Sequence, residues 1–380
     1  MKLPYGRQEI DDDDVRAVVE ALRSDWLTQG PAVERFERAL EASTGARHAV
    51  AVANGTVALH LACLAAELGP GDEGITTPIT FAASATCLAY VGATPRFVDI
   101  ERDTFNLDAT LLAAAITPRT RAIIPVHFGG LPCDLGAVRA VADRHGLVVI
   151  ADACHALGAL LDGKPIGGTG LAELIVLSFH PVKHVTTAEG GAVLTDDDTL
   201  ARRLRRLRHH GIVNTPDEIA PDQGGWYYEI QLLGINARLS DLHAALGASQ
   251  LARLDRFVAR RRELVARYRA ALAGVPGLRL QAEPAGRTHS YHLQVIWLDP
   301  AQHDRRRVYD ELRAQEIFTQ VHYIPVHFHP LHQRLSGAKR GDFPVAEEYY
   351  AGALSLPLFP AMRDEDVDRV TAALLRVLGR

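Results

Sequence analysis

The chain has 380 residues and a formal net charge of −5, and 47% of its residues are hydrophobic. This length and apolar content suit two folded domains and argue against a disordered chain. The mild acidity argues against a dedicated nucleic-acid binder, and no apolar run has the length of a signal peptide or a membrane span. We therefore expect a soluble, cytoplasmic protein.

Metal binding is not predicted. Four histidines lie in VHYIPVHFHPLH (321–332), but this segment lacks the carboxylates and the i,i+4 spacing of a catalytic zinc helix. The cysteines form no CxxC pair, so neither a zinc ribbon nor a redox dithiol is indicated, and buried thiols in a reducing compartment are expected. These cysteines are Cys63, Cys87, Cys133 and Cys154.

Short apolar runs alternate with helical patterns from residue 48 to about 195. The predicted strands lie at 48–53, 74–79, 94–100, 121–128, 147–153, 174–180 and 192–196. Strands that alternate with helices predict an α/β domain with a parallel or mainly parallel sheet. The continuous apolar runs indicate a sheet that is covered on both faces.

The pattern changes after Thr199. A basic helix is predicted at 200–212, an irregular loop at 214–225, and a long helical stretch at 240–272 in which Gly247 argues against one unbroken helix. From about residue 275 the pattern is that of a smaller α+β unit that ends in a helix. We therefore predict two domains, residues 1–250 and 251–380.

A lysine follows an apolar strand in SFHPVK (178–183), and TTAEGGAV (186–193) comes directly after it. A lysine on a turn beyond a buried strand is partly withdrawn from water, which lowers its pKa and makes a neutral nucleophilic amine available. Such an amine can form a Schiff base with an aldehyde cofactor, and the glycine pair lets backbone approach a ligand closely. For Lys183 alone, the alternative is an ordinary surface lysine.

An acid ends the strand at Asp152, where α/β sheets bind ligands. A buried carboxylate needs a cationic partner, and a protonated pyridine nitrogen is a suitable one. His155, three residues later, could hydrogen-bond a hydroxyl on the same ring. The alternative for Asp152 is that it caps the following helix.

A turn at Asn54-Gly55-Thr56 separates a predicted strand from a predicted helix. Gly55 and Thr56 offer free N–H groups and a hydroxyl to a phosphate at the start of that helix. Ser178 could supply another phosphate contact. Phe81 follows a further strand and could stack on a flat ring, with core packing as the alternative.

Taken together, these segments resemble the DegT/StrS family of sugar aminotransferases, which depend on pyridoxal phosphate (PLP). The resemblance covers nearly the whole chain in the family's order, and SFHPVK with TTAEGG is its most specific part. It is closest to the branch that aminates UDP-4-keto-6-deoxy-N-acetylhexosamines in the pseudaminic acid pathway. The segments that suggest this branch are 4–31, 178–183 followed by 186–193, 226–251 and 320–327.

The resemblance implies a fold, a cofactor and a set of cofactor contacts. The fold is the aspartate-aminotransferase-like fold type I, with a large, mainly parallel α/β domain and a small C-terminal α+β domain. Lys183 would be the catalytic residue that carries PLP. The cofactor-binding residues would be Asp152 at the pyridine nitrogen, His155 at the ring hydroxyl, Gly55, Thr56 and Ser178 at the phosphate, and Phe81 over the ring.

The resemblance also implies partners. Asn236 would reach the phosphate of the neighbouring subunit's cofactor, so a homodimer with shared active sites is expected. L-glutamate would donate the amino group to the keto carbon of a sugar nucleotide. The residues expected to contact that sugar nucleotide are Tyr5, Asp25, Trp26, Leu27, Thr28, Gln320, Val321, His322 and Tyr323.

Two other functions compete with this interpretation. One is a PLP-dependent sugar dehydratase or an aminotransferase for a different keto sugar, since some relatives replace the lysine by histidine and catalyse dehydration. Here Lys183 stands in the position expected for transamination, and His184 comes one place later. The other is a non-catalytic regulator on the same fold, against which the presence of Lys183 and Asp152 argues.

Overall fold

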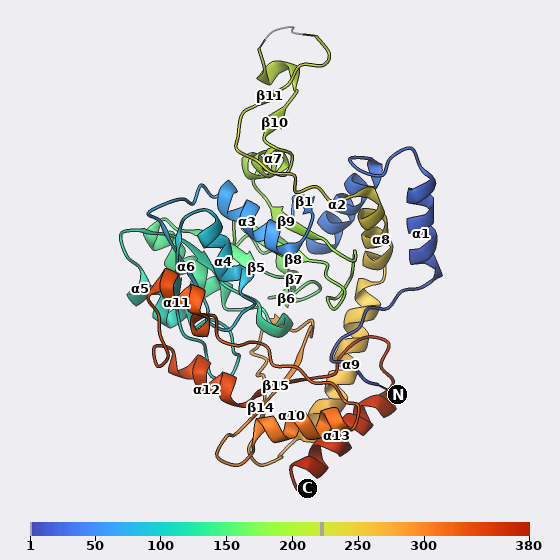
Figure 1. The fold of residues 1–380 in the computed structure, drawn as a ribbon, viewed down its shortest axis with the longest axis vertical. Helices are drawn as coiled ribbons and strands as arrows, with labels where there is room; N and C mark the ends of the chain where they lie inside the picture. The colour runs from blue at the N-terminus through green and yellow to red at the C-terminus, as the bar shows by residue number, and fades with distance from the viewer. Residues whose placement is uncertain (1, 221–223) are drawn as a thin grey trace.

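The computed structural model describes residues 2–220 and 224–380. A seven-stranded sheet in the order β1-β9-β8-β5-β4-β2-β3 forms its centre (Figure 1). The strands β3, β2, β4, β5 and β8 are parallel, and β9 runs antiparallel to both β8 and β1. Their bounds are β1 (His48–Val52), β2 (Glu73–Thr76), β3 (Thr94–Phe97), β4 (Thr120–Ile124), β5 (Val148–Asp152), β8 (Leu174–Ser178) and β9 (Gly191–Thr195).

Helices cover both faces of this sheet. In β1, Val50 and Val52 pack in one hydrophobic cluster, while Ala49 and Ala51 pack in the other, because successive side chains of a strand point to opposite faces. The predicted double coverage and the mainly parallel α/β fold are therefore confirmed. The helices of this part are α1 (Asp12–Arg23), α2 (Pro31–Thr44), α3 (Gly55–Ala65), α4 (Ala83–Tyr90), α5 (Leu112–Ala115), α6 (Leu135–His145) and α7 (Asp198–Leu207).

The predicted helical stretch at 240–272 consists of two helices, α8 (Asp241–Leu251) and α9 (Leu254–Leu272). The break falls after α8, and Gly247 lies inside α8. A Cβ at Gly247 would stand 2.6 Å from Thr187 and 2.8 Å from Phe36, so the glycine lets α8 pack closely on its neighbours. The expectation that the stretch is not one unbroken helix is therefore confirmed, but the break lies at 252–253, and Gly247 is a packing residue.

A second cluster of buried side chains lies below the large sheet, around a three-stranded sheet in the order β12-β14-β15 (Figure 1). Leu3 joins this cluster through a bridge to Ile317, so the N-terminal residues pack with the C-terminal ones. The division at residue 250 stays a prediction. The elements around this cluster are β12 (Leu278–Leu280), β14 (Gln294–Leu298), β15 (Ala353–Leu356), α10 (Arg305–Ala314) and α13 (Asp364–Val377). Two further C-terminal helices are α11 (Pro330–Ser336), which packs against β3, and α12 (Pro344–Gly352).

A hairpin of β10 (Ile212–Val213) and β11 (Glu229–Ile230) extends away from the rest of the protein (Figure 1). We call residues 212–235, apart from 221–223, the arm. The loop predicted at 214–225 belongs to it, and its residues 221–223 lie outside the described residues. Short strands β6 (Leu160–Leu161), β7 (Lys164–Pro165) and β13 (Arg287–Thr288) form a separate sheet. No described helix is both long enough and apolar enough to cross a bilayer.

Candidate active site

Asp152 is the last residue of β5 and is only 6% exposed. Its Oδ2 accepts a hydrogen bond from the Ser84 hydroxyl at 2.6 Å, and its Oδ1 accepts one from the Cys154 N–H at 3.0 Å. Within the described chain the carboxylate forms no ion pair. Because buried charges are normally paired, Asp152 is suited to a cationic ligand. The alternative, a cap on a following helix, is excluded because no described helix begins next to Asp152: α6 ends at His145, and the next helical segment is the short 3-10 helix Ile166–Gly168.

Lys183 lies on the loop after β8 and is half-buried, whereas the other lysines, Lys2, Lys164 and Lys339, are exposed. Burial lowers the pKa of Lys183, and the nearby Cys154 and Asp152 oppose that shift. The charge of Asp152 therefore reaches Lys183, although no ion pair within 4.0 Å joins them in the described structure. The amine is thus poised between burial, which favours its neutral form, and a carboxylate, which favours its charged form.

His155 is buried beside Asp152 and is held from two sides. Its Nδ1 accepts a hydrogen bond from the Gly129 N–H at 3.3 Å, so the proton of the neutral ring lies on Nε2. Nε2 is 3.1 Å from the hydroxyl oxygen of Tyr323 and donates to it. Burial lowers the pKa of His155 well below its ordinary value, and the charge of Lys183 adds to the shift. The ring is therefore neutral near pH 7.

A turn with free donors opens α3. Asn54 caps the helix by accepting from the Val57 N–H at 2.9 Å, while the N–H groups of Gly55 and Thr56 and the hydroxyls of Thr56 and Ser178 have no partner in the described chain. A Cβ at Gly55 would stand 2.9 Å from Ser178 Cβ, so the turn and the end of β8 meet. Unpaired donors at a helix N-terminus suit a phosphate.

The glycine pair after the lysine loop serves a different purpose from the predicted one. A Cβ at Gly191 would stand 2.6 Å from the Asn54 carbonyl and 2.7 Å from the Gly55 nitrogen. A Cβ at Gly190 would stand 2.1 Å from the Thr187 hydroxyl. Gly191 therefore lets the chain pass close behind the backbone of the turn at Asn54-Gly55, while Gly190 leaves room for the side chain of Thr187.

Aromatic side chains lie on the open side of the site. Phe81 is 60% exposed, so core packing does not apply to it, and its ring centre lies 6.2 Å from that of Tyr323. Tyr5 lies 5.2 Å, ring centre to ring centre, from His322, whose pKa burial and the charge of Lys183 lower to about 3. The structure thus brings Tyr5, His322 and Tyr323, three residues predicted to contact the sugar nucleotide, to the edge of the lysine site.

Other predicted contacts lie farther out. Asp25–Thr28 is exposed and pairs with the start of α8 through Thr28 and Ser240. Gln320 bonds its own neighbour, since its side chain accepts from the Val321 N–H. Asn236 is exposed and forms a backbone bridge with His209. No described hydrogen bond or ring contact joins these residues to Lys183 or Asp152, so their roles stay predictions.

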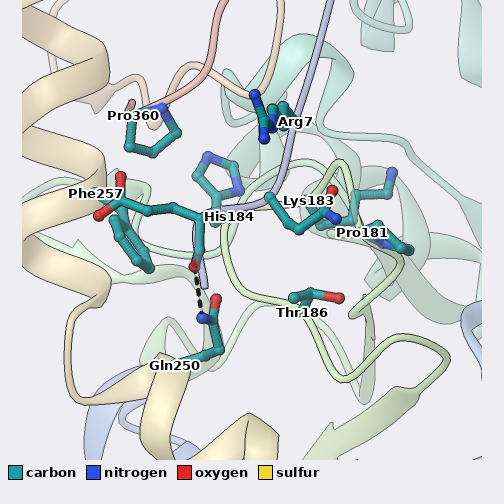
Figure 2. Close-up of a pocket in the computed structure, with 10 residues that line it drawn as sticks. Arg7, Pro181, Lys183, His184, Thr186, Gln250, Phe257 and Pro360 are labelled. Carbon is teal, nitrogen blue, oxygen red and sulfur yellow. Dashed lines mark hydrogen bonds between the residues drawn. The ribbon is translucent and has the colours of Figure 1, made fainter. Parts of the chain in front are cut away.

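The N-terminal segment passes over the lysine loop. Figure 2 shows Arg7 facing the loop that carries Pro181, Lys183, His184 and Thr186. The space enclosed between them is about 10 Å³, which is the room of a single water molecule. It is far too small for a cofactor, so this opening lies beside the site and is not the site itself.

Sequence reasoning missed several neighbours of the predicted residues. Ser84, which bonds Asp152, and Gly129, which bonds His155, come from other elements. The ring of His292 lies 4.4 Å from that of His155, centre to centre, and His184 is buried with its Nε2 3.0 Å from the Ser290 carbonyl. These contacts depend on tertiary packing, and only the polar character of Ser84 within an apolar helix hints at one of them.

The C-terminal histidines have separate protein partners. His322 bonds Ser355, His327 bonds Glu347, and His332 lies 3.2 Å from the Thr86 hydroxyl. Among residues 2–220 and 224–380, no group of three or more histidines, cysteines or acids is arranged to hold a metal ion. The histidine-rich segment therefore contributes to packing and to the edge of the lysine site.

The protein has a mainly parallel α/β sheet and a small C-terminal α+β unit. At the edge of the sheet lie a lysine that is partly withdrawn from water and a buried acid that forms no ion pair in the described chain. This combination is typical of PLP-dependent enzymes of fold type I. The chain matches the DegT/DnrJ/EryC1/StrS aminotransferase family over residues 8–375. It is 44% identical over 375 residues to the spore coat polysaccharide biosynthesis protein SpsC of Bacillus subtilis, a match that covers 98% of this chain and 96% of that protein. The chain belongs to this aminotransferase family.

Solved structures agree with that assignment. The PLP form of the putative sugar aminotransferase Spr1654 from Streptococcus pneumoniae is 30% identical and superimposes with a TM-score of 0.92, over 100% of this chain and 99% of the other. Helicobacter pylori PseC, an aminotransferase involved in pseudaminic acid biosynthesis, is also 30% identical, with a TM-score of 0.91 over the whole of both chains. The predicted fold type I, aminotransferase class and PLP cofactor are therefore confirmed.

Proposed function

We propose that the protein transfers an amino group from L-glutamate to C4 of a nucleotide-linked 4-keto-6-deoxy sugar. The substrate that fits the resemblance best is a UDP-4-keto-6-deoxy-N-acetylhexosamine, and the product is then UDP-4-amino-4,6-dideoxy-N-acetyl-β-L-altrosamine, as in pseudaminic acid biosynthesis. One observation carries the proposal. The half-buried amine of Lys183 lies within the electrostatic influence of a buried carboxylate, Asp152, that forms no ion pair in the described chain.

The residues present fit PLP. Lys183 would bond its aldehyde, Asp152 would face its ring nitrogen, and Thr56 with Ser178 and the N–H groups of the α3 turn would hold its phosphate. Phe81, exposed at the open side, would cover its ring. When bound, PLP supplies an electrophilic carbon for amines and an electron-poor ring that stabilises negative charge on the neighbouring carbon.

Lys183 moves the proton in both halves of the reaction. Its lowered pKa keeps the neutral form accessible, so in the first half the freed amine can move a proton from the donor's α-carbon to the aldehyde carbon of the cofactor. In the second half the same amine would run the transfer in reverse and place a proton on C4 of the sugar. Asp152 would bind the ring nitrogen of the cofactor through its carboxylate. His155 stays neutral. We propose that it contacts the ring hydroxyl of the cofactor, for which its Nε2–H would turn from the Tyr323 hydroxyl, its partner in this structure.

The sugar nucleotide would enter over the aromatic edge of the site. That edge is lined by Tyr5, His322 and Tyr323. Val321 directly precedes His322 in the sequence. We propose that Asp25, Trp26, Leu27, Thr28 and Gln320 complete the contacts, because they match the segments that touch the sugar nucleotide in the resembled branch. PseC, the structural relative of that pathway, and Spr1654, a putative sugar aminotransferase, support a sugar substrate.

We further propose a homodimer with shared active sites, in which Asn236 reaches the partner's cofactor phosphate. The arm supports this proposal, since it extends from the body and exposes large apolar side chains to solvent. Exposed apolar patches of this kind mark protein–protein contacts. The most exposed of these side chains are Trp226 at 81% and Leu233 at 92%.

Product analysis tests the substrate. Purified enzyme with L-glutamate is offered UDP-, dTDP- and GDP-linked 4-keto-6-deoxy sugars, and the products are identified by mass spectrometry and NMR. The proposal predicts a 4-amino sugar from the UDP-N-acetylhexosamine and ping-pong kinetics with 2-oxoglutarate release. A deoxygenated or dehydrated sugar, or amination only with a different keto sugar nucleotide, would contradict it.

A further inference from the structure

Ser84 is a residue of α4 with no exposed surface, and its hydroxyl has one proton to give. Three acceptors surround it: Asp152 Oδ2 at 2.6 Å, Thr80 Oγ1 at 2.7 Å and the Phe81 carbonyl at 3.3 Å. The carboxylate is the nearest and the only charged one of the three. Since hydrogen bonds to ionised groups are shorter and stronger than neutral ones, the Ser84 proton lies toward Asp152.

Thr80 reinforces this direction. With its proton given to Asp152, Ser84 Oγ accepts from the Thr80 hydroxyl, and the two residues form a chain Thr80–Ser84–Asp152 in the interior. Both hydroxyls are buried, and donors in series strengthen one another in such surroundings. The second carboxylate oxygen is held by the Cys154 N–H. Two neutral donors therefore hold the Asp152 carboxylate, and no cationic side chain of the described chain forms an ion pair with it.

We propose that Ser84 is a positioning residue that keeps Asp152 ionised toward the cofactor's ring nitrogen, so that the proton shared between the two stays on the nitrogen. This inference rests on the proposed function. The physical reason is that the hydrogen bond from the Ser84 hydroxyl stabilises the carboxylate form of Asp152 more than its protonated form. Without the Ser84 hydroxyl the carboxylate becomes a stronger base, so a larger share of the proton lies on its oxygen.

The test is the ring nitrogen of bound PLP, observed by ¹⁵N NMR with ¹⁵N-labelled cofactor at constant pH in wild type and Ser84→Ala. The ratio of nitrogen-protonated to oxygen-protonated forms should fall about tenfold to a hundredfold, the range for loss of a hydrogen bond to a charged group. The signal then moves toward that of a neutral pyridine. Ser84→Thr keeps the hydroxyl and should restore the wild-type signal.

Thr86→Ala is the matched control. Thr86 lies on the same helix, and its hydroxyl bonds the Ala82 carbonyl at 2.8 Å and lies near His332, away from Asp152. Its ¹⁵N signal should equal that of wild type. If Ser84→Ala does not fold, Thr80→Val decides, because removal of the second donor in the chain should shift the signal in the same direction by a smaller amount.

The outcomes separate the two proposals. If wild type holds PLP on Lys183 and the ¹⁵N signal is the same in wild type, Ser84→Ala and Thr80→Val, the role of Ser84 is refuted and the proposed function stands. An equal shift in Thr86→Ala would refute it too, since the effect would then be a general one of α4. If wild type forms no bond between Lys183 and PLP, both proposals fall.

Discussion

Residue 183 combines two properties that an exposed lysine lacks. Burial lowers its pKa, and Asp152 lies close enough to counter that shift. Lys2, Lys164 and Lys339, by contrast, are exposed on the surface. The chemistry assigned to the protein therefore depends on the surroundings of one amine, which a substitution can remove without touching the core.

Lys183→Ala should reduce turnover by at least about 10²–10⁴-fold, since a positioned acid–base group contributes about that much, and it should also remove the covalent hold on PLP. The measurement is the initial rate with L-glutamate and the keto sugar nucleotide, with circular dichroism to confirm folding. Lys164→Ala, at an exposed lysine, is the control and should behave as wild type. Near-normal turnover by Lys183→Ala would refute the assignment.

Individual site residues can be predicted from the sequence where they lie at the end of an apolar strand. Asp152 ends an apolar strand, and both Lys183 and the Gly55-Thr56 turn follow one. The carboxyl ends of parallel strands meet at one edge of a sheet, so these residues are expected to lie near one another. Their partners were not predictable. Ser84 reaches Asp152 from 68 positions away and Tyr323 reaches His155 from 168, so only the packed fold reveals these bonds.

At the scale of elements, β9 fixes the turn that opens α3. The chain at Gly191 runs so close to Asn54 and Gly55 that only a hydrogen fits between them. The free N–H groups of Gly55 and Thr56 therefore owe their position to a glycine in another strand. Strand and helix identities followed from hydrophobic periodicity, whereas the break between α8 and α9 and the packing role of Gly247 did not.

Gly191→Ala should displace the α3 turn, because its methyl would overlap backbone at 2.6–2.7 Å. We expect a loss of about 1–3 kcal/mol in the free energy of unfolding, as for overpacked cores, together with weaker PLP binding. Denaturant titration and reconstitution of the apoprotein with PLP measure the two effects. Gly69→Ala, at a glycine with open space around its Cβ position, serves as the control. Unchanged PLP affinity in Gly191→Ala would show that the turn does not hold the phosphate.

Across the whole molecule, buried imidazoles make the fold sensitive to acid. Burial lowers the pKa of each, so these rings stay neutral in the folded chain while the unfolded chain takes up protons below about pH 6.5. Their contribution to stability is thus complete above pH 6.5 and is lost as the pH falls below it. The residues are His127, His155, His184, His289, His292 and His322.

The free energy of unfolding should therefore fall between pH 6.5 and pH 5, with a slope of up to about 1.4 kcal/mol per pH unit for each such histidine. Urea titrations across this range measure it. His184→Gln keeps an N–H donor for the Ser290 carbonyl and should reduce the slope by about one proton. The same slope in the variant would show that His184 is protonated in the folded state.

The arm is the feature of the whole molecule that the sequence least prepared for. The sequence predicts an irregular loop only at 214–225, whereas the strands β10 and β11 lie on either side of that range and form a hairpin that extends from the body (Figure 1). Replacing Trp226 and Leu233 together by serine should weaken the dimer about tenfold to a thousandfold, because aromatic and apolar anchors dominate interfaces. Sedimentation velocity measures this, with Leu111→Ser as an exposed control on the body. If the wild type is monomeric, or if the substitutions leave the dimer unaffected, the arm does not form the proposed dimer interface.

The most direct test of the account is a map of the covalent link to PLP. The holoprotein is reduced with borohydride and digested, and each lysine-containing peptide is analysed by mass spectrometry for the added pyridoxyl phosphate. The account predicts the full mass shift on the peptide that contains Lys183 and none on those of Lys2, Lys164 and Lys339. A shift on another lysine, or no shift in protein that has been saturated with PLP, would contradict it.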